Sequence, residues 1–363
     1  MSTTISIPET PSPSLRVRWI DVAKGIGIIL VSFGHIRNGN GQSVWLPELN
    51  SAINIVYLFH MPLFFFLGGL TFSSRRPFPE FLKVKAKTLL VPYYIFSLYF
   101  LAKPIAALFS PSLVDSIQAN QDYAANIGMQ FYNILINGSA LWFLWAYFIG
   151  ELIVYPLSKL LSSHWQYSIC GLVLIAGSTT FASCLPSVTL PFCMVKGVEV
   201  AGYILIGLTC KQFLSHVHRK PSLLISAVLF ALLIGTASLA AHIEQRGWRI
   251  TCNTVGAFIG VAMAVCLSIA IYHNGVLEHI GRHSLSFYVV NAFTLNVGKI
   301  VFFKLLDIES TSASPLMQWV YGILLTVFCL ALLWVEDIII RTLIPWSVGL
   351  ERNRHPQQEN DTI

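Results

Sequence analysis

Apolar runs of membrane-spanning length alternate with short polar segments along nearly the whole chain. A membrane-spanning helix needs about 20 mainly apolar residues, and ten runs come close to that length. They lie near residues 19–37, 51–72, 88–109, 140–160, 166–184, 197–214, 221–241, 250–272, 283–304 and 316–345. This pattern predicts an all-α polytopic membrane protein with about ten transmembrane helices.

The two ends of the chain differ in composition from the region between them. Residues 1–18 are polar and rich in proline and serine, and they lack the apolar core and the cleavage site of a signal peptide. They predict a disordered cytosolic tail, and residues 347–363 predict a second one. Residues 19–346 then form a single transmembrane domain.

Composition and charge agree with this class and predict its orientation. Of the 363 residues, 55% are hydrophobic and 11% are charged, and the mean hydropathy of +0.67 is too high for a soluble globular protein. If the spans alternate, 15 of the 23 lysines and arginines fall on the side that holds both ends of the chain. The positive-inside rule therefore predicts cytosolic termini. Because the net charge of +6 then mostly faces lipid, we expect no nucleic-acid partner.

The first span carries a lysine and a histidine that are separated by ten uncharged residues, in the stretch KGIGIILVSFGH. Residues eleven apart on a helix point in nearly the same direction and lie about 16 Å apart, so Lys24 and His35 share one stripe. Asp21 and Ser32 lie beside this stripe. Such a layout suits a long anionic donor that reaches into the membrane. The alternative is that Lys24 extends to the interface and His35 only caps the helix.

The second span holds His60 two residues before Pro62. Proline removes a backbone hydrogen-bond donor, so we expect this helix to kink and to place His60 on the wall of a cavity. A structural histidine that bonds to a neighbouring helix is nearly as consistent with the sequence.

The segment after the second span contains the densest basic group in the chain: Arg75, Arg76, Lys83, Lys85 and Lys87. Attraction to anionic lipid on the cytosolic face explains this group adequately. A sharper hypothesis is that Arg75, Arg76 and Lys85 hold the phosphates of a nucleotide-bearing donor. The two interpretations are compatible.

The other polar features carry less information. The seven cysteines are scattered singly, without metal-ligand spacing, so we expect no bound metal. Cys184 and Cys193 flank an outward loop and could form a disulfide. The outward segment 110–139 is rich in amides and lacks lysine and arginine, which fits either a carbohydrate-facing surface or an interfacial helix.

Several of these stretches together resemble the acyltransferase 3 family of integral-membrane acyltransferases, and within it the fucose 4-O-acetylase-like branch of surface-polysaccharide O-acetyltransferases. The matching stretches are WIDVAKGIGIILVSFGHI, HMPLFFFLGGLTF, FLKVKAKTLLVPYYIFS, LWFLWAYFIGEL and IGRHSLSFYVVN. The family's characteristic block is an arginine, ten residues and a histidine. Here Lys24 stands in place of the arginine, as in that branch, and His35 matches.

The sequence departs from the family pattern at two further places. The Ser-Gly pair that usually follows the phenylalanine run is here Gly68-Gly69, and the histidine that often ends the ninth-helix motif is here Asn291. These departures argue against a catalytic serine or a second histidine at those positions, and they leave His35 as the principal catalytic candidate.

The resemblance implies a membrane O-acetyltransferase of the bacterial cytoplasmic (inner) membrane that acts in surface or exopolysaccharide biosynthesis. Its partners would be acetyl-CoA, a lipid-linked or polymeric glycan acceptor and membrane lipid, and acetyl-CoA would be a substrate rather than a bound cofactor. His35 would act as the general base or carry the acetyl group itself, with His60 as a second catalytic candidate. The donor would bind to Lys24, Arg75, Arg76 and Lys85.

Five polar residues are candidates to line the cavity: Asp21, Ser32, Trp142, Glu151 and Asn291. Asn291 and Trp142 could donate hydrogen bonds to an oxyanion. Glu151 could orient a histidine, or it could pair with Lys299 or with a cytosolic base.

A transporter or flippase of lipid-linked sugars is the alternative from another class, because it would share the polar cavity and the multiple spans. Such proteins show repeat symmetry and broken helices in corresponding halves, and this sequence has no evident repeat. A structural or sensory membrane protein would leave Lys24, His35 and His60 unexplained.

Overall fold

The computed structural model describes residues 17–37, 42–109, 126–214 and 219–350, and this part of the chain is all-α, without strands. Nine helical segments in it are long and apolar enough to cross a membrane, which confirms the predicted polytopic class. They are Pro47–Thr71, Phe78–Phe109, Ile127–Leu160, His164–Cys184, Pro191–Leu214, Ser222–His242, Arg246–Ile271, Ser284–Leu305 and Pro315–Leu343.

The long helices follow the chain in simple order. They are α1 (Arg18–Gly34), α2 (Asn50–Thr71), α8 (Trp142–Leu160), α9 (His164–Cys184), α10 (Met194–Leu214), α11 (Arg219–His242), α12 (Arg246–Ile271), α14 (Ser284–Ile300) and α15 (Pro315–Leu343). Shorter helices are α3 (Phe78–Lys85), α4 (Val91–Ser97), α5 (Ala102–Phe109), α7 (Ile127–Tyr132) and α13 (Gly275–Arg282). π-Helical turns at Ala86–Leu90, Asn133–Asn137 and Val301–Leu305 extend three of the spans.

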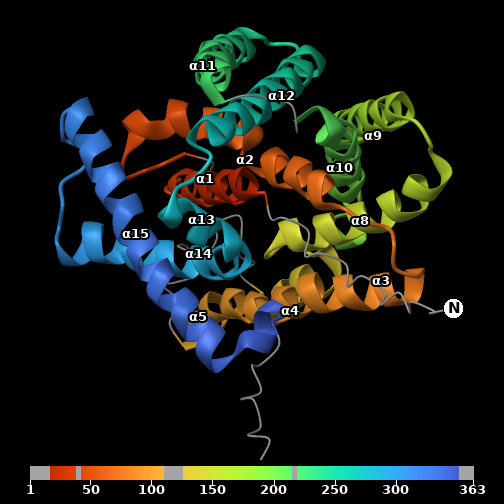
Figure 1. The fold of residues 1–363 in the computed structure, drawn as a ribbon. Helices are drawn as coiled ribbons and strands as arrows, with labels where there is room; N and C mark the ends of the chain where they lie inside the picture. Colours follow the sequence, from red (N-terminus) through yellow and green to blue (C-terminus); the bar gives the residue numbers. More distant parts are fainter. Residues whose placement is uncertain (1–16, 38–41, 110–125, 215–218, 351–363) are drawn as a thin grey trace, which may run out of the picture.

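The first predicted span is the central helix of the bundle rather than a full-length one. α1 has 17 residues and is therefore about 25 Å long, somewhat less than the hydrocarbon core of a bilayer. It packs against α2, α12, α13, α14 and α15, and Figure 1 shows it surrounded by other helices. The described residues thus contain nine helical segments of spanning length and the shorter central helix α1, in agreement with the predicted layout of about ten helices.

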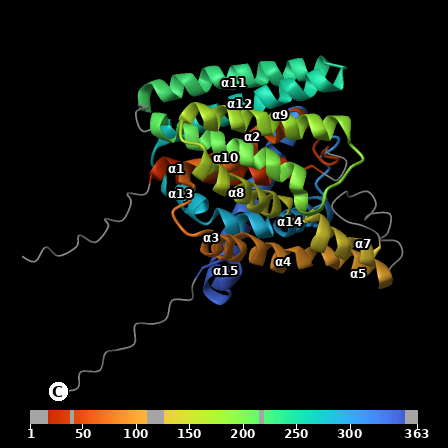
Figure 2. The same cartoon turned by 90° about the vertical axis from the view of Figure 1, so that its right-hand side faces the viewer.

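The outer helices present apolar side chains on the outside of the bundle. In Figure 2 α9, α10, α11 and α12 run in similar directions, with α11 at one edge of the molecule and α4 near the other. On α11, Leu223, Leu224 and Phe230 are 51–71% exposed. A row of large exposed apolar side chains is unfavourable in water but favourable against lipid, so it supports a multi-pass membrane protein.

The structure describes two segments that the sequence left open and contradicts one expectation. The basic segment is not a plain loop, because α3 begins at Phe78 and continues through a π-turn into α4; lysines near a helix C-terminus interact favourably with the helix dipole. The outward segment is helical over Ile127–Asn137, while residues 110–125 lie outside the described part. Cys184 and Cys193 are free thiols, so no disulfide joins them.

Candidate active site

A cavity of about 210 Å³ lies between α1, α2, α8 and α14. Its polar groups gather at one end of the bundle, where Thr71 ends α2, Thr88 follows α3 and Ser284 begins α14. Lys24 lies two turns into α1 and lines the same cavity. The remaining lining is apolar or aromatic, from Ile28, Met61, Phe64, Gly68, Leu89, Phe143, Leu144, Tyr147, Leu285 and Tyr288. The cavity therefore has a cationic, hydroxyl-rich mouth and an apolar interior.

Polar residues follow directly beyond the inner end of this cavity on three helices. On α1, Ser32 lies one turn beyond the lining residue Ile28, and on α14, Asn291 lies one turn beyond Tyr288. The Asn291 side-chain amide donates to Ser32 Oγ at 2.7 Å, which places these two helices at the same depth. On α2, His60 immediately precedes the lining residue Met61.

The structure brings His35 and His60 together around one tyrosine ring. The ring centroid of Tyr57 lies 5.9 Å from that of His35 and 4.7 Å from that of His60. Each histidine places its Nδ1 2.8 Å from the carbonyl oxygen four residues earlier, Val31 for His35 and Val56 for His60. Because a carbonyl can only accept, Nδ1 carries the hydrogen and Nε2 is the basic atom of each ring.

Two buried polar atoms in this group have no hydrogen-bond partner among the described residues: His60 Nε2 and Asn291 Oδ1. The side chains are only 1% and 3% exposed, respectively. Buried polar groups in proteins are nearly always hydrogen-bonded, so orphaned atoms just beyond a cavity indicate that a ligand or water approaches them. They are the strongest sign that this group is a functional site.

Two cations hold the end of α1 that carries His35. Lys299 Nζ donates to the carbonyl oxygens of His35 and Arg37 at 2.9 and 3.0 Å. The guanidinium carbon of Arg37 lies 3.4 Å from the centroid of the Tyr57 ring. Lys299 thus satisfies carbonyls at a helix C-terminus and does not pair with Glu151, one of the partners considered from the sequence.

The predicted donor-binding residues lie in different surroundings. Lys24 lines the cavity, whereas Arg75 and Arg76 are exposed at its end of the bundle and Arg76 Nε lies 3.6 Å from Glu80. Lys85 Nζ lies 2.5 Å from Glu151 Oε1, and Glu151 is 2% exposed. The charge of Lys85 therefore neutralises a buried carboxylate, and Glu151 pairs with a basic residue of the predicted cytosolic segment.

The five residues expected to line the cavity do not line it. Ser32 and Asn291 join each other beyond its inner end. Trp142 lies under Lys196, whose Nζ is 4.0 Å from the ring centroid. Asp21 Oδ2 lies 3.7 Å from Arg282 Nε on α13, and Glu151 is one turn from the lining residue Tyr147. Helical spacing predicts which face of its own helix each of these side chains occupies. It does not predict which residues of other helices lie next to that side chain.

A group of charges on α13 borders the mouth of the cavity. Arg282 Nη2 lies 2.6 Å from Glu278 Oε2, and Glu278 also hydrogen-bonds to His273. These bonds, first that of His273 and then that of Arg282, lower the pKa of the Glu278 carboxyl. The carboxylate is therefore charged at neutral pH and fixes Arg282 near Asp21 of α1.

Sequence reasoning missed the hydroxyl groups of the cavity and Tyr57. Thr71, Thr88 and Ser284 lie in three of the stretches that resemble the family, but no spacing within those stretches singles out their hydroxyl groups. Tyr57 lies three residues before His60, which places both on one face of a helix. That spacing could have indicated that Tyr57 lies beside His60.

A second cavity of about 310 Å³ lies near the opposite ends of the helices. It is lined by the end of α9, the loop 185–190 and the start of α10. Its polar lining comes from Asn137, Ser139, Thr189 and Lys196. The described part of the chain thus has a cavity toward each end of the bundle.

Comparison with known proteins gives one match. A family model described as an acyltransferase domain matches residues 17–335, which is nearly the whole chain and includes both cavities and the histidine pair. Searches of curated proteins and of solved structures found no match.

Proposed function

We propose that this chain, which belongs to the acyltransferase family matched over residues 17–335, is a membrane O-acetyltransferase. It transfers an acetyl group from cytosolic acetyl-CoA to a sugar hydroxyl of a lipid-linked or surface polysaccharide in the bacterial inner membrane. The observation that carries this proposal is the cavity that leads from Lys24 toward the orphaned polar atoms beside His35. Family membership favours acyl transfer over transport of the glycan.

The cavity suits the arm of a CoA thioester. Lys24 and the hydroxyl of Ser284 offer a cation and a hydrogen-bond donor for a phosphate at the mouth, whereas the Thr71 hydroxyl already donates within α2. The apolar interior accepts the uncharged arm and the thioester. Lys24 and His35 are about 16 Å apart along α1, a distance similar to an extended pantetheine arm, so a donor anchored at Lys24 presents its carbonyl near His35.

In the general-base route, His35 Nε2 removes the proton of the sugar hydroxyl as the oxygen attacks the thioester carbonyl. The tetrahedral intermediate then collapses, the C–S bond breaks, and the CoA thiolate takes the proton back from the imidazolium. In the acyl-histidine route, Nε2 attacks the thioester carbonyl and the C–S bond breaks to release the CoA thiolate. The sugar hydroxyl then attacks the acyl group on Nε2, the C–N bond breaks, and the hydroxyl proton passes to the thiolate. Both routes depend on the Nε2 atom of His35, which the bond from Nδ1 to Val31 keeps in the basic tautomer.

Neighbouring residues have supporting roles in this scheme. Ser32 Oγ accepts from Asn291, so its own O–H can donate to the oxyanion of the intermediate. His60 Nε2 can accept the hydrogen of the incoming hydroxyl and orient it. The second cavity, with its amide, hydroxyl and ammonium groups, is the proposed entry for the glycan from the other side of the membrane.

Replacing Lys24 by methionine is expected to raise the KM for acetyl-CoA at least about tenfold, because a charge-assisted hydrogen bond contributes roughly 1.5–3 kcal/mol. kcat should change little, because the lysine binds the donor and does not react. Initial rates at varied acetyl-CoA concentration measure this. The control is Lys211→Met at the exposed end of α10, and an unchanged KM in Lys24→Met would disprove the anchoring role.

The exposed arginines should act on the donor through long-range charge. The double variant Arg75→Gln/Arg76→Gln is expected to weaken acetyl-CoA binding at low salt and to have little effect above about 0.5 M salt, where exposed charges are screened. Binding isotherms at several salt concentrations measure this. If variant and wild type bound acetyl-CoA equally well at every salt concentration, the arginines would not act on the donor. The basic segment would then only set the orientation of the protein in the membrane.

A further inference from the structure

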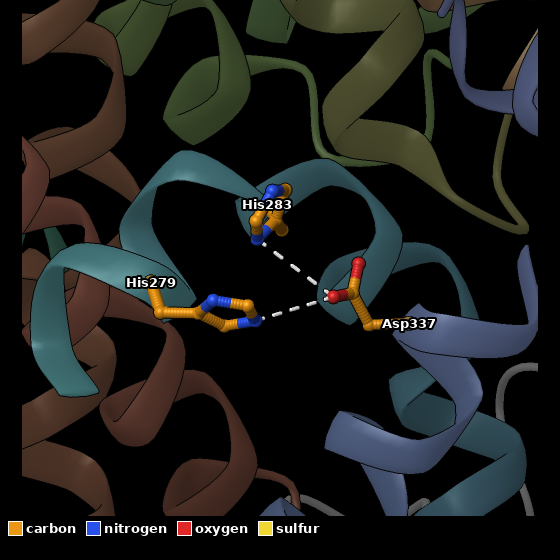
Figure 3. A group of neighbouring side chains, drawn as sticks. All are labelled: His279, His283 and Asp337. Carbon is orange, nitrogen blue, oxygen red and sulfur yellow. Dashed lines mark ion pairs between the residues drawn. The ribbon is translucent and has the colours of Figure 1, made fainter. Parts of the chain in front are cut away.

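A second histidine pair lies at the junction of α13 and α14, away from His35. His279 is in the last turn of α13, His283 follows this helix, and Asp337 projects toward both from α15 (Figure 3). His279 Nε2 lies 3.4 Å from Asp337 Oδ2, and His283 Nδ1 lies 3.7 Å from the same oxygen. All three ligand atoms lie within 4.8 Å of one another.

These ring nitrogens are buried and unsatisfied. Neither His279 Nε2 nor His283 Nδ1 has a hydrogen-bond partner among the described residues, since both contacts to Asp337 are too long or poorly aligned. Asp337 itself is 0% exposed. The acetyl-transfer scheme uses none of these three side chains. Two buried ring nitrogens that face one buried carboxylate without a hydrogen bond are therefore left without an explanation by the fold alone.

We propose that His279, His283 and Asp337 bind a divalent transition-metal ion of the zinc type. Two imidazoles and one carboxylate are a ligand set that zinc takes in proteins, with a fourth position for water. Bonds of about 2.0–2.1 Å in a tetrahedron place ligand atoms roughly 3.3–3.5 Å apart. The nitrogen-to-oxygen distance of 3.4 Å falls in this range and that of 3.7 Å is slightly longer. The three ligand atoms lie within 4.8 Å of one another, so the side chains must draw closer together to hold the ion.

Three neighbouring side chains hold the ligands in place. Ser286 Oγ donates to Asp337 Oδ1 at 2.5 Å, and Arg341 Nη2 lies 2.8 Å from Oδ2. The ring of His279 stacks on Trp334, with centroids 4.0 Å apart. Arg341 Nε also donates to both carboxylate oxygens, at 3.0 Å to Oδ1 and 2.9 Å to Oδ2, so an ion on Oδ2 would share that oxygen with the guanidinium. Outer partners of this kind orient metal ligands in known sites.

The position of the site indicates a structural role. His283 directly precedes Ser284 and Leu285, which line the donor cavity. An ion held by α13, α14 and α15 would fix this part of the cavity wall against the last long helix. Binding of the ion requires only these three ligands and is independent of acetyl transfer.

Cobalt titration of the full-length chain, purified in detergent without a histidine tag, tests the site. We expect about one Co²⁺ per chain, seen as visible absorption typical of four or five ligands and displaced by Zn²⁺. The double variant His279→Gln/His283→Gln should lose this absorption, while His164→Gln/His242→Gln should keep it. Ser286→Ala should weaken binding by about 10–100-fold.

A wild-type chain that takes up no stoichiometric Co²⁺ would overturn the proposal, and so would equal uptake by the His279→Gln/His283→Gln variant. If that variant does not fold, tryptophan fluorescence locates the ion instead. Bound Co²⁺ should quench Trp334, so Trp334→Phe, which keeps an aromatic ring beside His279, should remove most of the quenching while the Co²⁺ absorption is still observed. Quenching that persists in Trp334→Phe would place the ion elsewhere and overturn the proposal.

Discussion

Replacing His35 by alanine is expected to abolish acetyl transfer to the glycan while acetyl-CoA still binds. The variant loses the atom that takes the hydroxyl proton or carries the acetyl group, a loss of about 10²–10⁴ in rate for a general base. Folding should survive, because His35 is only half-buried and its Nδ1 bond joins residues of the same helix. Transfer of labelled acetate and binding of acetyl-CoA, measured on the same preparation, give both quantities.

The matched control is His242→Ala. His242 makes the same Nδ1 bond to the carbonyl four residues earlier, at the end of α11, but its side chain is exposed and lies in neither cavity. It should retain full activity. His35→Gln should be as inactive as His35→Ala, because an amide cannot act as a base at neutral pH. Near-normal transfer by purified His35→Ala would remove His35 from the chemistry.

Replacing Gly281 by valine is expected to have the largest effect on stability. The backbones of α1 and α13 meet at two glycines: a Cβ on Gly281 would overlap the carbonyl oxygen of Asp21, and a Cβ on Gly25 would overlap that of Leu277. Backbone atoms of two packed helices cannot rotate aside, so the helices must separate. Overpacking costs about 1–3 kcal/mol and sometimes more, and we expect about 3 kcal/mol or more here.

Thermal unfolding and the yield of monodisperse protein in detergent measure this loss. Gly177→Val and Gly235→Val are the controls, since both glycines are helical and a Cβ on either meets nothing within 4 Å. These variants should keep nearly the wild-type melting temperature. If Gly281→Val also kept the wild-type melting temperature, the close contact of α1 and α13 would not stabilise the part of the protein beside Lys24.

Most of the fold follows from the sequence because lipid requires long apolar helices. Predicted spans such as 51–72 and 166–184 agree with α2 and α9 to within two residues. The misjudged boundaries were those that depend on packing. The span predicted at 88–109 begins ten residues earlier in the structure. The helix can include the basic residues of α3 because the aliphatic parts of their side chains lie along the protein.

The site was predictable where a single residue is unusual for its surroundings. Lys24, His35 and His60 stand out in apolar runs, and the structure places Lys24 on the cavity and the histidines beside one another around Tyr57. Pairings between distant segments were not predictable. The bond between Lys85 and Glu151 joins residues 66 apart, and no local pattern encodes it.

The His279 site shows the same limit. The two histidines are four residues apart, which is a visible signal for one face of a helix. Their third partner, Asp337, lies in an apolar run of another helix. Only the packing of α15 against α14 reveals that the three side chains converge.

Acetyl transfer by the reconstituted protein is the most direct test of the account. The full chain would be placed in lipid vesicles with radiolabelled acetyl-CoA and the lipid-linked precursor of the host's surface polysaccharide. We predict that label appears on the glycan as a base-labile ester, and that the His35→Ala protein forms none. Vesicles that move the glycan across the membrane but leave it unlabelled would contradict the acetyltransferase proposal.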